Sequence, residues 1–272
     1  MAIVVTGAGG FVGRELVSQL LARGHAVTAI DTFPGGIPQG ARAIAGDLGD
    51  AAVRAEALST GCTALDHLAT VPGGAAEVDP VASRRINLDA MYDLLLEAGA
   101  ANPGLRVVYA SSIAVFGDPL PALVDDATLL NPKMIYGGHK AMMEHAVAMV
   151  SNRGLIDGVT VRLPGILARP KGSSGMKSAF MSDLFHALKA GETFVCPVSA
   201  GGTIWAQWVR CVAANFVHAL GLDTALVTYR PDPALELAFA AQPPLATPAA
   251  DHAGFAHDGN LARLVATALA TI

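Results

Sequence analysis

The stretch Ile3-Val4-Val5-Thr6-Gly7-Ala8-Gly9-Gly10-Phe11-Val12-Gly13 decides the fold of this 272-residue chain. Its first residues form an apolar run that predicts a buried strand, and apolar residues then recur at helical spacing. The glycines at the junction permit a tight turn and a close approach of the backbone to a pyrophosphate, while the free N–H groups of the helix start face the phosphates. The residues predicted to bind a dinucleotide here are Gly7, Gly10, Phe11, Val12 and Gly13.

Strands and helices alternate along the residues that follow. The predicted strands are 2–5, 26–30, 43–45, 64–68, 106–110 and 160–163, and the main predicted helices are 11–23, 80–101 and 136–152. Strands that alternate with helices imply right-handed crossovers and a parallel sheet covered on both faces. The pattern therefore predicts an α/β fold with a Rossmann-type, doubly wound parallel sheet.

The strand ends indicate which dinucleotide binds. Asp31 ends the second predicted strand, where a carboxylate can accept hydrogen bonds from the adenosine ribose and would repel a 2′-phosphate. No Arg or Lys follows it directly, so NAD is favoured over NADP. Asp47 and Leu48 follow the third strand, where the carboxylate can meet the adenine amino group or, alternatively, cap a helix. Leu68 and Ala69 end the fourth strand on the expected nicotinamide side.

A proton-transfer site is indicated by Tyr136 and Lys140, which are spaced i and i+4 on one predicted helix and therefore share a face. A free phenol has a pKa of about 10. A neighbouring ammonium and the positive charge of an oxidised nicotinamide are expected to lower the pKa of Tyr136. Ser112, at the end of the fifth strand, can hold a substrate oxygen while Tyr136 takes its proton. This combination predicts an oxidoreductase.

These motifs together resemble the extended short-chain dehydrogenase/reductases, a group that includes nucleotide-sugar epimerases and dehydratases. The matching stretches are 6–13, 47–48, 67–69, 85–89, 111–117, 136–140 and 162–165. The resemblance is close over about the first two-thirds of the chain and looser in the tail. Residues that it implies to be catalytic are Ser112, Tyr136, Lys140 and Asn87, and further residues that it implies to contact the cofactor are Lys140, Leu163 and Pro164.

Further stretches look most like the D-erythronate dehydrogenase branch, namely 73–77, 115–121, 154–158, 162–164 and 195–198. That resemblance implies NAD-dependent oxidation of the hydroxyl next to a carboxylate on a small sugar acid. Arg210 stands where epimerases commonly have Asp, and it can either bind the carboxylate through two parallel hydrogen bonds or serve as a structural residue. Residues expected to border the substrate are Gly73, Gly74, Ser112, Ile113 and Arg210, together with the loop 171–175.

Two other functions remain open. A nucleotide-sugar 4-epimerase would use the same scaffold, whereas a dehydratase would need an acidic residue beside Ser112 or Tyr136, where Ile113 and Ile135 stand. A non-catalytic dinucleotide-sensing regulator would not need to keep Ser112, Tyr136 and Lys140 together. We therefore predict an NAD-dependent dehydrogenase of the extended short-chain type, with Tyr136 as the general base.

The alternation fades after Pro164, which predicts two parts. Residues 1–165 are expected to form the NAD-binding Rossmann domain with the catalytic residues. Residues 166–272 are expected to form a smaller, shortened substrate-binding lobe, interleaved with the first domain and placed over the carboxyl edge of the sheet.

The composition of the chain limits the kinds of binding partner that we expect. The net charge is −5, charged residues make up 15%, and no basic run is present, so we expect neither nucleic acid nor a membrane surface as a partner. Cys62, Cys196 and Cys211 are widely spaced, which predicts free thiols and no metal site. With no signal peptide expected, the chain is predicted to be cytoplasmic.

A homodimer is also expected. Many members of the resembled family form a four-helix interface from the helices predicted here at 80–101 and 136–152. An apolar set compatible with that interface consists of Met91, Leu94, Leu95 and Met142.

Overall fold

The computed structural model describes residues 1–59, 61–167, 169–170, 179–199, 202–221, 248 and 252–254. The chain divides into two compact units, Met1–Ala225 and Leu226–Ile272. The first unit contains every helix and strand discussed below. Within the described residues, no helix has the length and apolar character needed to cross a membrane.

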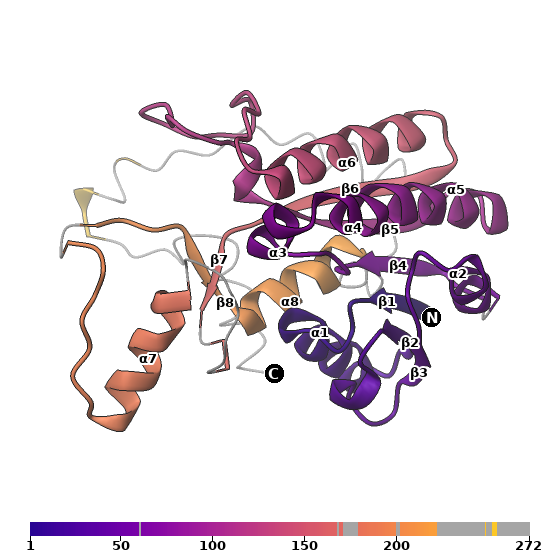
Figure 1. Cartoon of the computed structure of the whole chain (residues 1–272), viewed down its shortest axis with the longest axis horizontal. Helices are drawn as coiled ribbons and strands as arrows, with labels where there is room; N and C mark the ends of the chain where they lie inside the picture. The colour runs from indigo at the N-terminus through magenta and orange to yellow at the C-terminus, as the bar shows by residue number, and fades with distance from the viewer. Residues whose placement is uncertain are drawn as a thin grey trace. The chain divides into compact units, whose positions relative to one another are not determined.

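A six-stranded parallel sheet forms the centre of the first unit (Figure 1). Its strands are β1 (Ala2–Thr6), β2 (Ala26–Asp31), β3 (Arg42–Ala45), β4 (Ala64–His67), β5 (Leu105–Ser112) and β6 (Ile156–Leu163). They stand in the order β3-β2-β1-β4-β5-β6. The chain therefore starts in the middle of the sheet, winds to one edge and then returns to build the other half, which confirms the predicted doubly wound fold.

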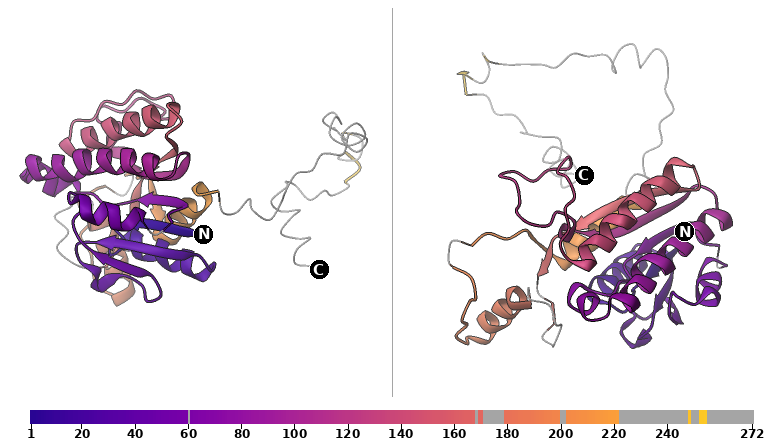
Figure 2. Two further views of the ribbon diagram at one scale, coloured as in Figure 1. Left: turned by 90° about the vertical axis from the view of Figure 1, so that its right-hand side faces the viewer. Right: turned by 45° about the horizontal axis from the view of Figure 1, so that its top comes forward.

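Helices cover both faces of this sheet (Figures 1 and 2). One face is covered by α1 (Phe11–Ala22) and α8 (Val209–Ala219), and the other by α2 (Ala51–Leu58), α5 (Met91–Ala101) and α6 (Ile135–Asn152). Successive strand residues point to opposite faces. Accordingly Ile3 and Val5 pack with the first helix layer, whereas Val4 packs with the second.

The predicted helix 80–101 is interrupted. It consists of α4 (Pro80–Arg84), the π-helical segment η2 (Arg85–Ala90) and α5, and a separate short helix α3 (Gly73–Val78) precedes it. A π turn adds one residue to the repeat and shifts the side chains that follow. Three residues of the expected dimer set, Met91, Leu94 and Leu95, are completely buried in the chain's own core. They face the sheet and are not available to a partner.

Beyond β6 the chain forms smaller elements and then returns to the sheet. Two short strands, β7 (Gly165–Leu167) and β8 (Ala206–Trp208), pair in parallel, and α7 (Phe180–Ala190) lies between them in sequence. Helix α8 then packs against α1, where its Phe216 is fully buried. Part of the range 166–272 therefore belongs to the same core as the first 165 residues.

Candidate active site

The turn between β1 and α1 has the backbone geometry of a phosphate cradle. Gly7 adopts a φ of +67°, and a Cβ on it would stand 2.7 Å from the backbone nitrogen of Ala69. A Cβ on Gly13 would overlap the carbonyl oxygen of Gly7. Helix α1 begins at Phe11, and its N-cap residue Gly10 has no side chain to cap it, so the first N–H groups of the helix are left for an anion. The turn fits the pyrophosphate of a dinucleotide.

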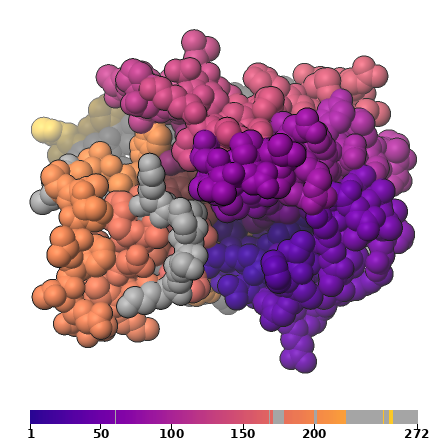
Figure 3. All heavy atoms as spheres, in the orientation of Figure 1, coloured from indigo at the N-terminus to yellow at the C-terminus, as the bar shows by residue number. Residues whose placement is uncertain are grey.

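Asp31 is held against this turn. The N–H of Gly9 donates to its Oδ2 and the N–H of Phe33 donates to its Oδ1, each at 2.9 Å. A carboxylate oxygen can accept more than one hydrogen bond, so Asp31 can still receive the hydroxyls of a ribose. Figure 3 shows the indigo N-terminal segment recessed beneath the purple surface at the position of α3 and α4 in Figure 1.

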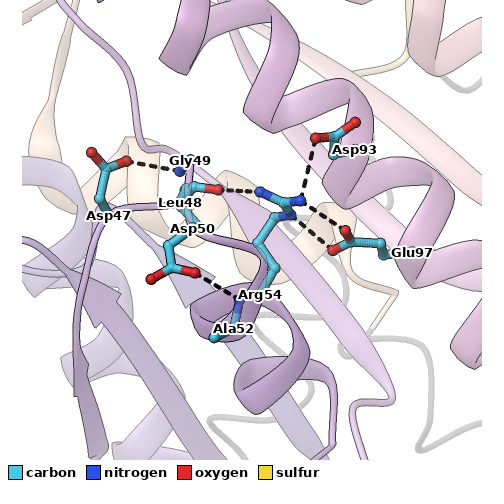
Figure 4. A network of polar contacts seen from close by, with 8 residues as sticks. All are labelled: Asp47, Leu48, Gly49, Asp50, Ala52, Arg54, Asp93 and Glu97. Carbon is cyan, nitrogen blue, oxygen red and sulfur yellow. Dashed lines mark hydrogen bonds and ion pairs between the residues drawn. The ribbon is translucent and has the colours of Figure 1, made fainter.

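The turn after β3 is fixed by a polar network (Figure 4). Asp47 accepts the N–H of Gly49 at 2.7 Å and forms an ion pair with Arg85. Burial alone would raise the pKa of Asp47, but these hydrogen bonds and the charge of Arg85 lower it. Leu48 is buried, and its carbonyl accepts Nη1 of Arg54 at 2.6 Å, which in turn pairs with two acidic residues of α5. The Asp47 carboxylate is thereby kept ionised and oriented.

The end of β4 lies directly beside the glycine turn. The N–H of Leu68 donates to the carbonyl of Thr6 at 3.2 Å, and the N–H of Ala69 donates to the Thr6 hydroxyl at 3.3 Å. The same hydroxyl meets Nδ1 of His67 at 2.9 Å. Burial, followed by the charge of Lys140, lowers the pKa of His67 to about 3, which keeps the imidazole neutral.

Ser112, Tyr136 and Lys140 come together at the carboxyl end of β5. The Ser112 hydroxyl and the Tyr136 phenol are hydrogen-bonded. The Lys140 Nζ stands 5.7 Å from the centroid of the Tyr136 ring and 4.7 Å from that of Tyr109, and it donates to the carbonyl of Ala110 at 2.6 Å. A strand end thus supplies the hydroxyl, and one face of α6 supplies the phenol and the amine.

Burial governs the ionisation of this group. It raises the pKa of Tyr136, although the hydrogen bond from Ser112 and the charge of Arg169 act in the opposite direction. Burial also lowers the pKa of Lys140 to about 7, against the raising effect of Glu144. The spacing of Tyr136 and Lys140 led us to expect a lowered pKa for the Tyr136 phenol. The protein's own side chains do not produce it, because the desolvation of the phenol outweighs the hydrogen bond from Ser112 and the charge of Arg169.

Asn87 orders the loop that follows β4. It is buried in η2, where its Oδ1 accepts the N–H of Val71 at 2.7 Å and the hydroxyl of Thr70 at 3.1 Å. Its Nδ2 donates to the carbonyl of Val71 at 3.0 Å and to the Ser83 hydroxyl at 3.1 Å. All of its polar atoms are thus used to hold this loop beside the site.

The start of α3 lies next to the proposed base. A Cβ on Gly73 would stand 3.9 Å from the Cβ of Tyr136, and Gly74 follows in the same turn. Glu77 accepts the N–H of Ile135 at 2.7 Å, which ties α3 to the beginning of α6. The Cε of Met134 stands nearer still, 3.0 Å from the Cβ position of Gly73, so Gly73 packs closely against Met134 next to Tyr136.

Of the remaining predicted site residues, three lie at the strand ends and others belong to a loop. Leu163 stands opposite Ser112 in the register of β5 and β6, and Pro164 follows it. Ile113 directly follows Ser112 in the short 3₁₀ helix η3 (Ile113–Val115). These residues share the strand ends at the site, whereas the predicted loop 171–175 lies outside the described residues.

Arg210 lies elsewhere among the described residues. It is on α8, where its Nε stands 3.5 Å from Oε1 of Glu15 in α1 and its Cζ lies 5.5 Å from the Trp208 ring centroid. Its side chain is 64% exposed. These contacts differ from those of the Ser112 group, and the substrate role predicted for Arg210 has no support from them.

Arg169 is a site residue that sequence reasoning missed. Its Cζ lies 5.2 Å from the ring centroid of Phe11, at the start of α1, and its charge acts on Tyr136. The sequence offers only a single Arg-Pro pair within a loop-like stretch, with no periodic pattern to assign its direction. Tertiary packing alone reveals its position.

Known proteins are similar to this chain in sequence. Residues 3–219 match the model of a family described as the NAD dependent epimerase/dehydratase family. A D-erythronate dehydrogenase of Cupriavidus necator is 35% identical over 235 residues, covering 82% of this chain and 72% of that protein. A second one, of Haemophilus influenzae, is 34% identical over 232 residues, covering 82% and 73%.

A solved structure resembles this one as well. The crystal structure of the nucleoside-diphosphate-sugar epimerase from Agrobacterium tumefaciens superposes with a TM-score of 0.74 at 32% sequence identity. The match covers 81% of this chain and 69% of that chain. Sequence and architecture therefore lead to the same group of proteins.

Proposed function

The chain belongs to the NAD dependent epimerase/dehydratase family, and we propose that it is an NAD-dependent dehydrogenase that oxidises a hydroxyl of a small sugar acid. The observation that carries the proposal is the hydrogen bond between the Ser112 hydroxyl and the Tyr136 phenol, whose ring centroid lies 5.7 Å from the Lys140 Nζ. Similarity to two D-erythronate dehydrogenases over about four-fifths of the chain supports the substrate class.

The residues suited to hold NAD follow from the geometry. The N–H groups at the start of α1 would hold the pyrophosphate, Asp31 would receive the ribose hydroxyls, and Asp47 would meet the adenine edge. The backbone at Leu163 and Pro164 is suited to the nicotinamide carboxamide. When bound, NAD⁺ supplies the acceptor for the hydride that leaves the alcohol carbon.

The protein's own side chains carry out the proton transfer. The Ser112 hydroxyl donates to the substrate oxygen and fixes its position. Tyr136, as the phenolate, accepts the proton of the substrate hydroxyl as the alcohol becomes a carbonyl. The Lys140 Nζ lies over the Tyr136 ring and, when protonated, stabilises the phenolate. Asn87 keeps the neighbouring loop in place.

The proposal is tested by following NADH absorbance at alkaline pH with four- to six-carbon aldonic and uronic acids. We expect a four-carbon acid such as D-erythronate to reduce NAD. Tyr136→Phe should lower kcat by at least about 100-fold, because a general base is removed, while its affinity for NAD stays within about twofold. Equal activity of the two proteins would contradict the role of Tyr136.

A 4-epimerase is the second candidate, because the Agrobacterium tumefaciens structure at 32% identity is a nucleoside-diphosphate-sugar epimerase. The same hydroxyl, phenol and amine can serve an epimerase. No NADH formation across the acid panel, together with interconversion of a UDP-hexose and its 4-epimer, would favour this alternative over the dehydrogenase.

A further inference from the structure

Arg169 is held in a fixed position by α7. Its N–H donates to the Ser182 hydroxyl at 3.2 Å, and Nε2 of His186 lies 2.7 Å from its carbonyl oxygen. Ser182 is itself buried. The backbone of Arg169 is thus fixed on both sides of its Cα, and the side chain extends toward Phe11 at the start of α1.

Among the described residues, the Arg169 guanidinium has no carboxylate partner, unlike those of Arg54 and Arg162. Arg54 pairs with acidic residues of α5, and Arg162 pairs with Glu144 at 2.8 Å. In the part of the chain that the structure describes, no carboxylate pairs with Arg169 and its guanidinium donates no hydrogen bond. A partly desolvated cation without a partner is unfavourable unless a ligand supplies the negative charge.

We propose that the Arg169 guanidinium binds the carboxylate of the substrate through two parallel hydrogen bonds, an inference that rests on the proposed function. Its Cζ lies 5.2 Å from the Phe11 ring centroid and its charge acts on Tyr136, so a carboxylate next to the reacting hydroxyl is the substrate anion that it would meet. Planar, bidentate pairing suits this fork of donors. Arg169 thereby takes the role that the sequence suggested for Arg210, which pairs with Glu15 instead.

Two alternatives fit the contacts less well: that Arg169 binds the pyrophosphate, and that Lys140 binds the substrate carboxylate. The pyrophosphate already has the uncapped N–H groups at the start of α1. Lys140 is buried beneath Tyr136, and its Nζ is bound to the carbonyl of Ala110. Among the charged side chains described at this site, Arg169 is therefore the cation left for a substrate anion.

Equilibrium binding to a non-reacting complex tests the assignment. D-erythronate is titrated calorimetrically into the full chain carrying Tyr136→Phe and saturated with NAD, and then into the same protein with Arg169→Gln added. Loss of a charge-assisted pair should weaken binding of the acid by about 10- to 150-fold. Binding of the uncharged D-erythronamide should change by less than about threefold. Arg153→Gln, at an exposed position after α6, is the matched control.

The outcomes separate the two proposals. If the wild-type protein does not oxidise D-erythronate but the binding of D-erythronate still depends on Arg169, the proposed reaction is wrong and the proposed carboxylate site stands. A different result is that oxidation occurs but Arg169→Gln weakens the binding of the acid and of the amide equally, or weakens the binding of NAD instead. The guanidinium then contacts another group, and the assignment is overturned. Loss of acid binding in Arg210→Gln alone, or no acid binding at all, also overturns it.

Discussion

Asp66 is a carboxylic acid in an apolar environment at the centre of the sheet. It stands in β4 between Val5 of β1 and Val108 of β5, and it is completely buried. Neither of its oxygens has a hydrogen-bond partner among the described residues. Burial raises the pKa of Asp66 well above its ordinary value, so the folded protein keeps a proton that the unfolded chain releases.

This linkage gives stability a definite pH dependence. The contribution of Asp66 is fully present below its unfolded pKa of about 4 and is lost as the pH rises through the raised, folded pKa. Asp66→Val replaces the acid with an apolar side chain and should raise the free energy of unfolding by about 1–3 kcal/mol at pH 8. The gain at pH 5 should be smaller.

Urea unfolding at both pH values measures the difference. Asp66→Asn provides the control, since it keeps the shape and cannot ionise. Its free energy of unfolding should change less between pH 5 and pH 8 than that of the wild type. An equal gain from Asp66→Val at both pH values would show that Asp66 binds its proton equally in the folded and unfolded chains, against the predicted linkage.

The residues that we propose to be catalytic each belong to a local pattern in the sequence. Tyr136 and Lys140 are linked by helical spacing, and Ser112 ends a strand. The direction of the Tyr136 pKa shift could not be predicted, because it depends on how much of the phenol the surrounding chain desolvates. Arg169 was missed for a related reason, since Phe11, which its guanidinium contacts, is distant in sequence.

Among the elements, α6 carries two adjacent glycines in opposite environments. A Cβ on Gly137 would overlap the carbonyl oxygen of Ala114, whereas a Cβ on Gly138 would meet nothing within 4 Å. Gly138→Ala should therefore raise the free energy of unfolding by about 0.5–1 kcal/mol, because alanine loses less backbone entropy in a helix. Gly137→Ala should lower it by about 1–3 kcal/mol, because the helix must move away from Ala114.

Chemical denaturation of the two variants and the wild type provides the comparison. The two glycines are neighbours in one helix, so intrinsic helix propensity is the same at both positions and only the contacts differ. Equal effects of the two substitutions would contradict the close approach of α6 to Ala114.

The interrupted helix 80–101 marks the limit of prediction at this scale. Its apolar residues recur with helical periodicity, and that pattern is correct for α5. Periodicity does not reveal η2, because a single π turn leaves the type of each residue unchanged. The turn becomes intelligible only with Asn87, whose amide must reach the backbone of Val71 after β4.

For the whole first unit, the alternation of strands and helices was sufficient to predict a parallel, doubly wound sheet, because crossover connections have a preferred hand. The return of the chain was harder to predict. Helix α8 packs on α1, which precedes it by almost two hundred residues. The local sequence of an amphipathic helix does not indicate which element its apolar face packs against. The prediction that residues 166–272 form a smaller lobe, interleaved with the first domain, followed from the fading alternation alone.

An apolar surface remains on the outer side of α5 and α6, which lie side by side on one face of the sheet (Figure 2). Its exposed residues are Tyr92, Leu96, Met142 and Met149, each between 37% and 51% exposed. Met142 belongs to the set that the sequence suggested, and Tyr92, Leu96 and Met149 replace its three buried members. We propose that two copies of the chain associate through this surface, because burying it against a second copy removes apolar area from water.

Leu96→Glu combined with Met142→Glu should separate such a dimer, since a two-fold axis brings like charges from both copies into one interface. Light scattering after size exclusion should give twice the 27.8 kDa of the chain for the wild type and 27.8 kDa for the double variant. Leu123→Glu combined with Leu129→Glu changes two residues that are more exposed and lie outside these helices, and this control should keep the wild-type mass. A wild-type protein that stays at 27.8 kDa at micromolar concentration would refute association through α5 and α6.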